Sequence, residues 1–375
     1  MKIHIAALAV IPLLLLAGCA TTPEETTETP HGYVEGAAEL AEPQLGLAYA
    51  EDGGETLHLF DLATEESREV ALSFPAATID QDERFVYVGD GGDRVEIIDT
   101  GVWTIDHGDH VHYYRADPRS VGVVTVPGDV TAVAGQGARA AITSDDGTVT
   151  ILDRRALESG EVSEIATVAG EIAIPYRDGT VVVADGRVRL VDDGGADIAP
   201  LDASCSDPVD VAAQRSGVVI SCDGAVVLVK QQAGTEYAVE LEAVAAGEIG
   251  SRPRSNGVSI AAGDAGVLQV DVAAESLVLV PLPSAAVAAA SPADDLRVLT
   301  VHADGTVRSS GFDGSELATA TLPGDGAALV LDTARAYATV VGSRTVLELD
   351  YADGLRVARE FDLAVAPELI VEIGR

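Results

Sequence analysis

The sequence has few basic residues for its length. Its 375 residues include 23 Lys and Arg against 61 Asp and Glu, which gives a formal net charge of −38. A protein this negative repels a phosphate backbone, so we expect no nucleic-acid partner. The charge would attract cations, although solubility, salt adaptation or a compositional bias explains it equally well. The 47% hydrophobic fraction excludes a disordered chain and allows a sizeable core.

Apolar runs long enough to span a membrane are also missing. The apolar stretch from Ile3 to Leu16 is too short for a transmembrane helix and, following Lys2, indicates a secretory signal. The next residues, Leu-Ala-Gly-Cys19, resemble the bacterial lipobox, which implies cleavage before Cys19 and acylation of this residue. The alternative is an ordinary signal peptide followed by an incidental Cys. We therefore expect an extracytoplasmic protein of the bacterial cell envelope, attached to the membrane only by its lipid.

These features divide the chain into three parts. Residues 1–18 are the expected lipoprotein signal peptide. Residues 19–43 are the acylated Cys and a disordered tether, because Ala20–Pro30 is rich in Thr, Glu and Pro and has little to bury. Residues 44–375 are expected to form one domain, and we expect the protein to be a monomer.

Cysteine is scarce, with three residues in all. With Cys19 assigned to the anchor, Cys205 and Cys222 remain, and export permits a disulfide between them. A pair of buried thiols is the alternative. A cysteine metal site is not expected, because two ligands are too few and no Cys-x-x-Cys motif is present.

The body of the chain repeats one pattern eight times. Each copy has two β-favouring runs joined by a Gly/Asp turn, as in residues 85–99 (FVYVGDGGDRVEIID) and 139–153 (RAAITSDDGTVTILD). Such copies are typical of β-hairpins, and their spacing of about 40 residues is typical of a β-propeller. We predict an all-β fold with eight blades of four antiparallel strands; seven blades and one irregular unit is the alternative. The last strand, within Pro367–Gly374, is expected to complete the first blade.

The blade pattern also brings the two remaining cysteines together. Cys205 precedes an inner strand that begins near Val209, and Cys222 ends the following strand. Neighbouring antiparallel strands place the two residues at the same end of one blade. A disulfide there would close a loop of roughly 18 residues and stabilise the fold by about 3 kcal/mol.

One interval between copies, from Asp99 to Asp153, is about 15 residues longer than the others. The excess contains a cluster of potential zinc ligands: His107, His110, His112, Asp106 and Asp109. Imidazole and carboxylate are the groups expected around Zn²⁺. On an extended chain His110 and His112 point the same way, and His107 joins them through a bend at Gly108. A polar surface loop with several His is the alternative.

The segment Ile98–His110 resembles a motif of the AztD-type zinc metallochaperones, and so do His31–Ala37 and the residues around the Cys205 and Cys222 pair. These proteins are exported β-propellers that deliver zinc to the solute-binding protein of a zinc ABC transporter. The resemblance implies zinc as the cargo and that solute-binding protein as the partner. Neutral imidazole is the ligand form, so we expect zinc binding to weaken below about pH 6.

The sequence also departs from that family at the starts of the inner strands. Histidines are expected there, but this chain has Asp129, Glu171 and Asp210 nearby. These carboxylates either line the mouth of the channel, where they could bind a hard cation weakly, or serve as turn residues.

Other classes of function lack their characteristic residues. A calcium-dependent lactonase propeller needs Asn ligands, and Asn256 is the only Asn; quinoprotein propellers need repeated Trp, and Trp103 stands alone. No Gly-x-Ser-x-Gly nucleophile motif is present, so we expect no enzymatic activity. The alternative function is a non-catalytic lipoprotein propeller that docks another cell-envelope protein without binding metal.

Overall fold

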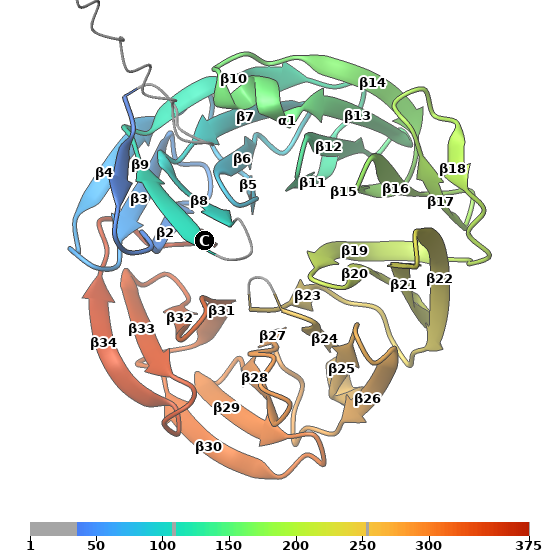
Figure 1. Ribbon diagram of the computed structural model, residues 1–375. Coiled ribbons are helices and arrows are strands. Elements are labelled where there is room, and N and C mark those ends of the chain that lie inside the picture. Colours follow the sequence, from blue (N-terminus) through green and yellow to red (C-terminus); the bar gives the residue numbers. More distant parts are fainter. Residues whose placement is uncertain (1–35, 107–109, 253–254, 375) are drawn as a thin grey trace, which may run out of the picture. The chain divides into compact units, whose positions relative to one another are not determined.

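Short strands separated by Gly- and Asp-rich turns account for most of the chain. The computed structural model describes residues 36–106, 110–252 and 255–374, so the predicted signal peptide (residues 1–18) and Cys19 lie outside it. Most of the described strands of the unit Val34–Arg375 form eight four-stranded antiparallel sheets, arranged around a central channel as the blades of a propeller (Figure 1). The predicted all-β fold with eight blades is confirmed.

The strands of each blade are given from the channel outward. Blade 1 contains β35 (Leu369–Ile373), β2 (Gly46–Ala50), β3 (Thr56–Asp61) and β4 (Ser67–Ala71). Blade 2 contains β5 (Thr78–Gln81), β6 (Phe85–Gly89), β7 (Arg94–Asp99) and β10 (Arg119–Thr125). Blade 3 contains β11 (Val130–Gln136), β12 (Arg139–Ser144), β13 (Thr148–Asp153) and β14 (Glu164–Ala169). Blade 4 contains β15 (Ile172–Tyr176), β16 (Gly179–Ala184), β17 (Arg187–Val191) and β18 (Asp197–Ala199). Blade 5 contains β19 (Ser206–Gln214), β20 (Gly217–Asp223), β21 (Ala225–Gln232) and β22 (Thr235–Glu242). Blade 6 contains β23 (Ile249–Gly250), β24 (Gly257–Ala261), β25 (Val267–Asp271) and β26 (Ser276–Val280). Blade 7 contains β27 (Ala288–Ala290), β28 (Arg297–Val301), β29 (Thr306–Gly311) and β30 (Glu316–Thr321). Blade 8 contains β31 (Gly326–Leu331), β32 (Ala336–Val340), β33 (Thr345–Asp350) and β34 (Arg356–Asp362).

A ninth sheet lies outside the blades. It has three strands, in the order β1 (Ala38–Leu40), β9 (Val111–Arg115) and β8 (Val102–Asp106). The tether is predicted to extend to residue 43, whereas β1 is an ordered strand within that range. The described helices are α1 (Arg154–Glu158) and a 3₁₀ turn at Gly263–Ala265. Neither of them has the length and hydrophobicity needed to cross a membrane.

The two ends of the propeller meet in blade 1. Strand β35 pairs with β2 over five residue pairs, from Gly46 opposite Ile373 to Ala50 opposite Leu369. The C-terminal strand therefore supplies the inner strand of the first blade, as the sequence predicts. With β35 in place, blade 1 has four strands like the other described blades, and the ring is closed.

The apolar core is divided into layers between the blades. Each of the eight buried clusters in the described residues contains side chains from two neighbouring blades. Across the closure, Leu47 and Tyr49 of blade 1 pack with Tyr337 and Val346 of blade 8. Both faces of a blade are thus buried, which explains the continuous apolar runs of its middle strands.

The Asp that ends the third strand in most copies has a structural role. Oδ1 of Asp61 accepts hydrogen bonds from the backbone N–H groups of Ala63, at 2.8 Å, and Thr64, at 3.0 Å. The equivalent residues accept backbone hydrogen bonds in the same way: Asp153, Asp192, Asp271 and Asp350. A carboxylate that caps its own turn favours the reversal into the outer strand. Part of the acidic composition therefore serves the fold.

The predicted disulfide is present. Cys205 and Cys222 are bonded with their Cα atoms 5.3 Å apart, at one end of blade 5. Both residues are buried in the apolar layer between blades 4 and 5. A disulfide of this kind is typical of proteins outside the cytoplasm.

Replacing both cysteines should destabilise the propeller. The double variant C205A/C222A is expected to lower the free energy of unfolding by about 3 kcal/mol, because the bond links residues 17 positions apart in the sequence. Denaturant unfolding measures the change. As a control, reduction should lower the stability of the wild-type protein to that of the variant and leave the variant unchanged. Equal stability of the oxidised wild type and the variant would contradict this prediction.

Candidate metal-binding hairpin

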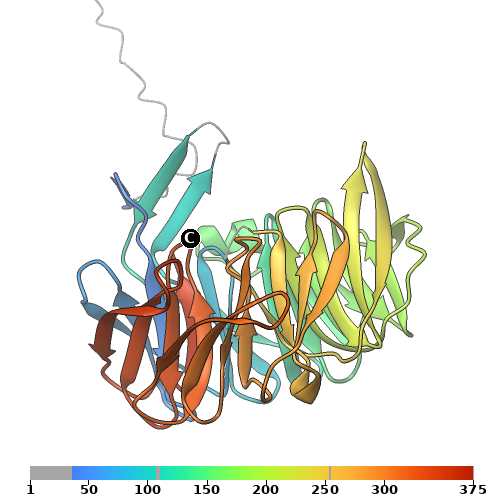
Figure 2. The ribbon, with the colours of Figure 1, turned by 90° about the horizontal axis from the view of Figure 1, so that it is seen from below.

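The candidate ligands belong to a hairpin that stands outside the blades. Strands β8 and β9 form it, between the third strand of blade 2, β7, and the outer strand, β10. This is the insertion that the long sequence interval predicts. Figure 2 shows the hairpin (teal) projecting from one face of the ring, with β1 (dark blue) beside it.

A buried arginine attaches the hairpin to blade 2. The guanidinium of Arg84 donates two hydrogen bonds to the carboxylate of Asp99, at 3.0 and 2.8 Å. The same guanidinium lies 3.9 Å from the ring centre of Trp103, the first aromatic residue of β8. All three residues are at least 95% buried, so a cation paired with a carboxylate holds the indole in one position.

A glycine allows the two strands to approach each other where the hairpin begins. Gly101 has φ of +73°, and a Cβ atom on it would lie 2.4 Å from the carbonyl oxygen of Ala116. The N–H of Ala116 donates a hydrogen bond of 2.7 Å to the Gly101 carbonyl. Only glycine combines this backbone conformation with such close contact.

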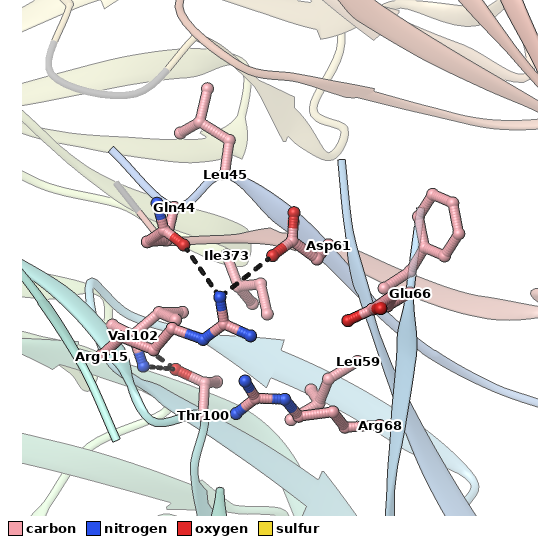
Figure 3. Close-up of a pocket in the computed structure, with 12 residues that line it drawn as sticks. Gln44, Leu45, Leu59, Asp61, Glu66, Arg68, Thr100, Val102, Arg115 and Ile373 are labelled. Atoms are coloured by element: carbon pink, nitrogen blue, oxygen red, sulfur yellow. Dashed lines mark hydrogen bonds and ion pairs between the residues drawn. The ribbon is translucent and has the colours of Figure 1, made fainter. Parts of the chain in front are cut away.

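Arg115, at the end of β9, connects the hairpin base to blade 1. Its guanidinium lies 3.4 Å from Oε1 of Gln44 and 3.8 Å from the carboxylate of Asp61, beside a cavity of about 40 Å³ (Figure 3). Arg68 of blade 1 donates a hydrogen bond of 3.2 Å to the Ala116 carbonyl. The hairpin is therefore held to two blades at its base.

One face of the hairpin carries a row of rings that ends in the histidines. Trp103 lies opposite Tyr114 and Ile105 opposite His112, so the alternation of side chains places all four on the same face. The ring centres of Trp103 and Tyr114 are 5.4 Å apart, those of Tyr114 and His112 are 6.2 Å apart, and those of His112 and His110 are 4.8 Å apart. The structure thus brings His110 and His112 together, as their spacing suggests.

Asp106, one of the two predicted aspartate ligands, is placed differently. Asp106 lies opposite Val111, so it occupies the face opposite His112, and it lines the central cavity. His107 and Asp109 lie outside the described residues. Among the residues that are described, no three His, Cys, Asp or Glu side chains form a metal-binding group.

Strand β1 adds a carboxylate that the sequence does not reveal. Glu39 lies opposite Tyr114, on the histidine face, and its Oε1 is 2.6 Å from Nδ1 of His112. Only a strand pairing between segments 73 residues apart creates this contact, and no local pattern signals it. His110, His112 and Glu39 are the described His and carboxylate side chains on this face, and they do not by themselves form a three-ligand metal group.

Tyr114 is the buried member of this face. Burial raises the pKa of its hydroxyl, and the charge of Glu39 raises it further. Its hydroxyl oxygen has no hydrogen-bond partner among the described residues. A buried polar atom in this state commonly contacts a water molecule or an ion in solution.

The central cavity, of about 660 Å³, contains a second group of acids. Asp210 lines it, whereas Asp129 and Glu171 are exposed and are not part of its lining. Burial raises the pKa of Asp80 to about 7, and the charge of Asp210 contributes. Burial also raises the pKa of Asp210 to about 6, although two backbone N–H groups donate to its carboxylate at 2.7 Å.

Replacing Asp80 should therefore stabilise the protein at high pH. An acid with a raised pKa in the folded state favours folding when protonated and opposes it once the pH exceeds the unfolded value. The stability that Asp80 contributes near pH 4 is lost as the pH rises through about 7. We expect Asp80→Asn to match the wild type near pH 4 and to exceed it at pH 8 by up to about 4 kcal/mol in denaturant unfolding.

The control for this prediction is Glu171→Gln, which removes the same charge from an exposed position outside the cavity. It should leave the pH dependence of stability unchanged. An Asp80→Asn variant with the same stability profile as the wild type from pH 4 to 8 would contradict the prediction.

Comparisons with known proteins show the fold. No family model matches the sequence, and no curated protein matches it. Among solved structures, AztD from Citrobacter koseri has a TM-score of 0.75 at 18% identity, covering 89% of this chain and 99% of that chain. Dihydro-heme d1 dehydrogenase NirN has a TM-score of 0.56 at 12% identity, covering 88% and 76%. BamB from Moraxella catarrhalis has 0.55 at 13%, covering 81% and 93%.

The similar structures include a dehydrogenase, so the fold alone does not decide whether the chain is an enzyme. The similarity to AztD extends over nearly all of the described chain and agrees with the resemblance found in the sequence. In its fold, the chain is an AztD-like β-propeller.

Proposed function

We propose that the protein is an extracytoplasmic zinc-binding accessory protein that passes Zn²⁺ to the solute-binding protein of a zinc ABC transporter. The observation that carries the proposal is the pair of imidazoles, His110 and His112, whose ring centres lie 4.8 Å apart on a projecting hairpin. The predicted ligands His107 and Asp109 lie between β8 and β9 in the sequence, outside the described residues. Two to three imidazoles with a carboxylate are a donor set that zinc prefers.

The position of the site suits a cargo that has to leave again. The His112 side chain is 26% exposed and that of Glu39 is 48% exposed. A site at the end of a hairpin can be reached by a partner without any opening of the ring. The anionic protein would also raise the local concentration of cations and assist their capture.

Zinc titration of the soluble domain tests the proposal directly. We expect a stoichiometric site in competition with a chromophoric chelator, and H110A/H112A should weaken it by roughly 100-fold or more, since both imidazoles are ligands. The matched control is Val111→Ala, which changes the opposite face of the same strand. It should bind zinc like the wild type.

Zinc binding no stronger than that of other acidic proteins would overturn the proposal. The remaining function would then be the docking of another cell-envelope protein without metal. If instead the zinc affinity is high but unchanged in H110A/H112A, the ligands lie elsewhere in the chain.

The lipid anchor is a separate part of the proposal. Cys19→Ala in the full-length chain should move the protein from the membrane fraction to the soluble fraction after cell lysis. The reason is that the sequence has no apolar run long enough to hold the protein in the membrane in place of the lipid. Immunoblotting of the two fractions measures the change, with C205A/C222A as the control that keeps Cys19. Retention of Cys19→Ala on the membrane would show that another feature attaches the protein.

A further inference from the structure

The N-terminal strand β1 is a small addition to the hairpin. It pairs with β9 through three residue pairs, Ala38 with Arg115, Glu39 with Tyr114, and Leu40 with Tyr113. Its central residue is the one whose side chain reaches the histidine face. The strand comes directly before blade 1 in the chain, yet it extends the sheet of an insertion in blade 2.

The contact made by this central residue fixes the ring of His112. Glu39 Oε1 lies 2.6 Å from Nδ1, so with an ionised carboxylate the proton of the bond belongs to Nδ1. The ring is also stacked 6.2 Å from Tyr114, with 23° between the planes. A histidine held by a carboxylate at Nδ1 binds metal through Nε2, and the carboxylate increases its strength as a ligand.

From this geometry we infer that Glu39 is a positioning residue of the zinc site, and that the site is complete only when β1 is docked on β9. The inference rests on the proposed function, since it assigns Glu39 a role toward the zinc that His110 and His112 bind. It makes the N-terminal segment, which joins the propeller to the predicted anchor, a part of the metal site.

A purely structural role for the Glu39 contact accounts poorly for its position. Both partners are partly exposed, at 26% and 48%, and exposed pairs of this kind contribute about 0 to 1 kcal/mol to stability. The hairpin is already anchored by Arg84 and Arg115. The hydroxyl of the buried Tyr114, on the same face, is a further polar group, and it has no hydrogen-bond partner among the described residues.

The inference predicts a change of zinc affinity without a change of fold. In chelator competition, Glu39→Gln should weaken zinc binding by about 10- to 100-fold, the usual effect of removing a carboxylate behind a ligating histidine. Glu39→Asp should recover part of the loss. The matched control is Glu42→Gln, which removes the same charge from the same exposed segment and should bind like the wild type. The thermal midpoints of all four proteins should agree.

The tautomer of His112 provides a readout that a structural role would not change. In ¹⁵N spectra of the metal-free protein at pH 8, wild-type His112 should be protonated at Nδ1, and Glu39→Gln should shift it toward a mixture of tautomers. Equal zinc affinity and equal tautomers in the wild type and Glu39→Gln would overturn the inference. If H110A/H112A still lost binding, the proposed function would stand. Absence of zinc binding by the wild type would overturn both.

Discussion

The pairing of the last strand with the first blade is the constraint on which the rest of the structure depends. Each apolar layer of the ring needs a blade on both sides, and the layer between blades 8 and 1 exists only if blade 1 is complete. The five residue pairs between β2 and β35 complete it. Without them Leu47 and Tyr49 would lose their neighbours, and a row of backbone groups on β2 would be left unpaired.

In this closed ring, the residues that build the blades are different from the residues that could bind a ligand. The blades are built from repeated local rules, namely apolar middle strands, tight turns and an Asp that caps the turn after the third strand. None of these residues is available for chemistry, because each is buried or occupied by its own turn. The features that differ from blade to blade carry the candidate functions: the hairpin on blade 2 and the acids of the central cavity.

The fold could be predicted from the sequence because each blade contains its own signals. The strands, the turns and the closing strand near Leu369 all follow from short patterns. Alternation along β9 also predicts that His110 and His112 share a face. It could not place Asp106, since the register of the hairpin depends on the turn between the strands. The role of Glu39 does not follow from the sequence for a different reason, because it depends on a pairing between distant segments that no local pattern encodes.

The cavity acids show the same limit. The expected start of an inner strand near Val209 draws attention to Asp210, but no comparable pattern marks Asp80. Whether an acidic side chain faces the channel or the neighbouring blade depends on the register of a four-residue strand, β5. Local patterns therefore identify the elements, while packing between elements decides which side chains meet.

The order of the first two strands has a mechanical consequence. A force applied to the chain before residue 36 acts first on β1 and reaches β2 only after β1 has yielded. The ladder of β1 has three residue pairs, whereas β2 is paired on both sides, with five pairs to β35 alone. We therefore expect β1 to detach from β9 at a lower force than the force that separates β2 from β35, so that the ring stays closed.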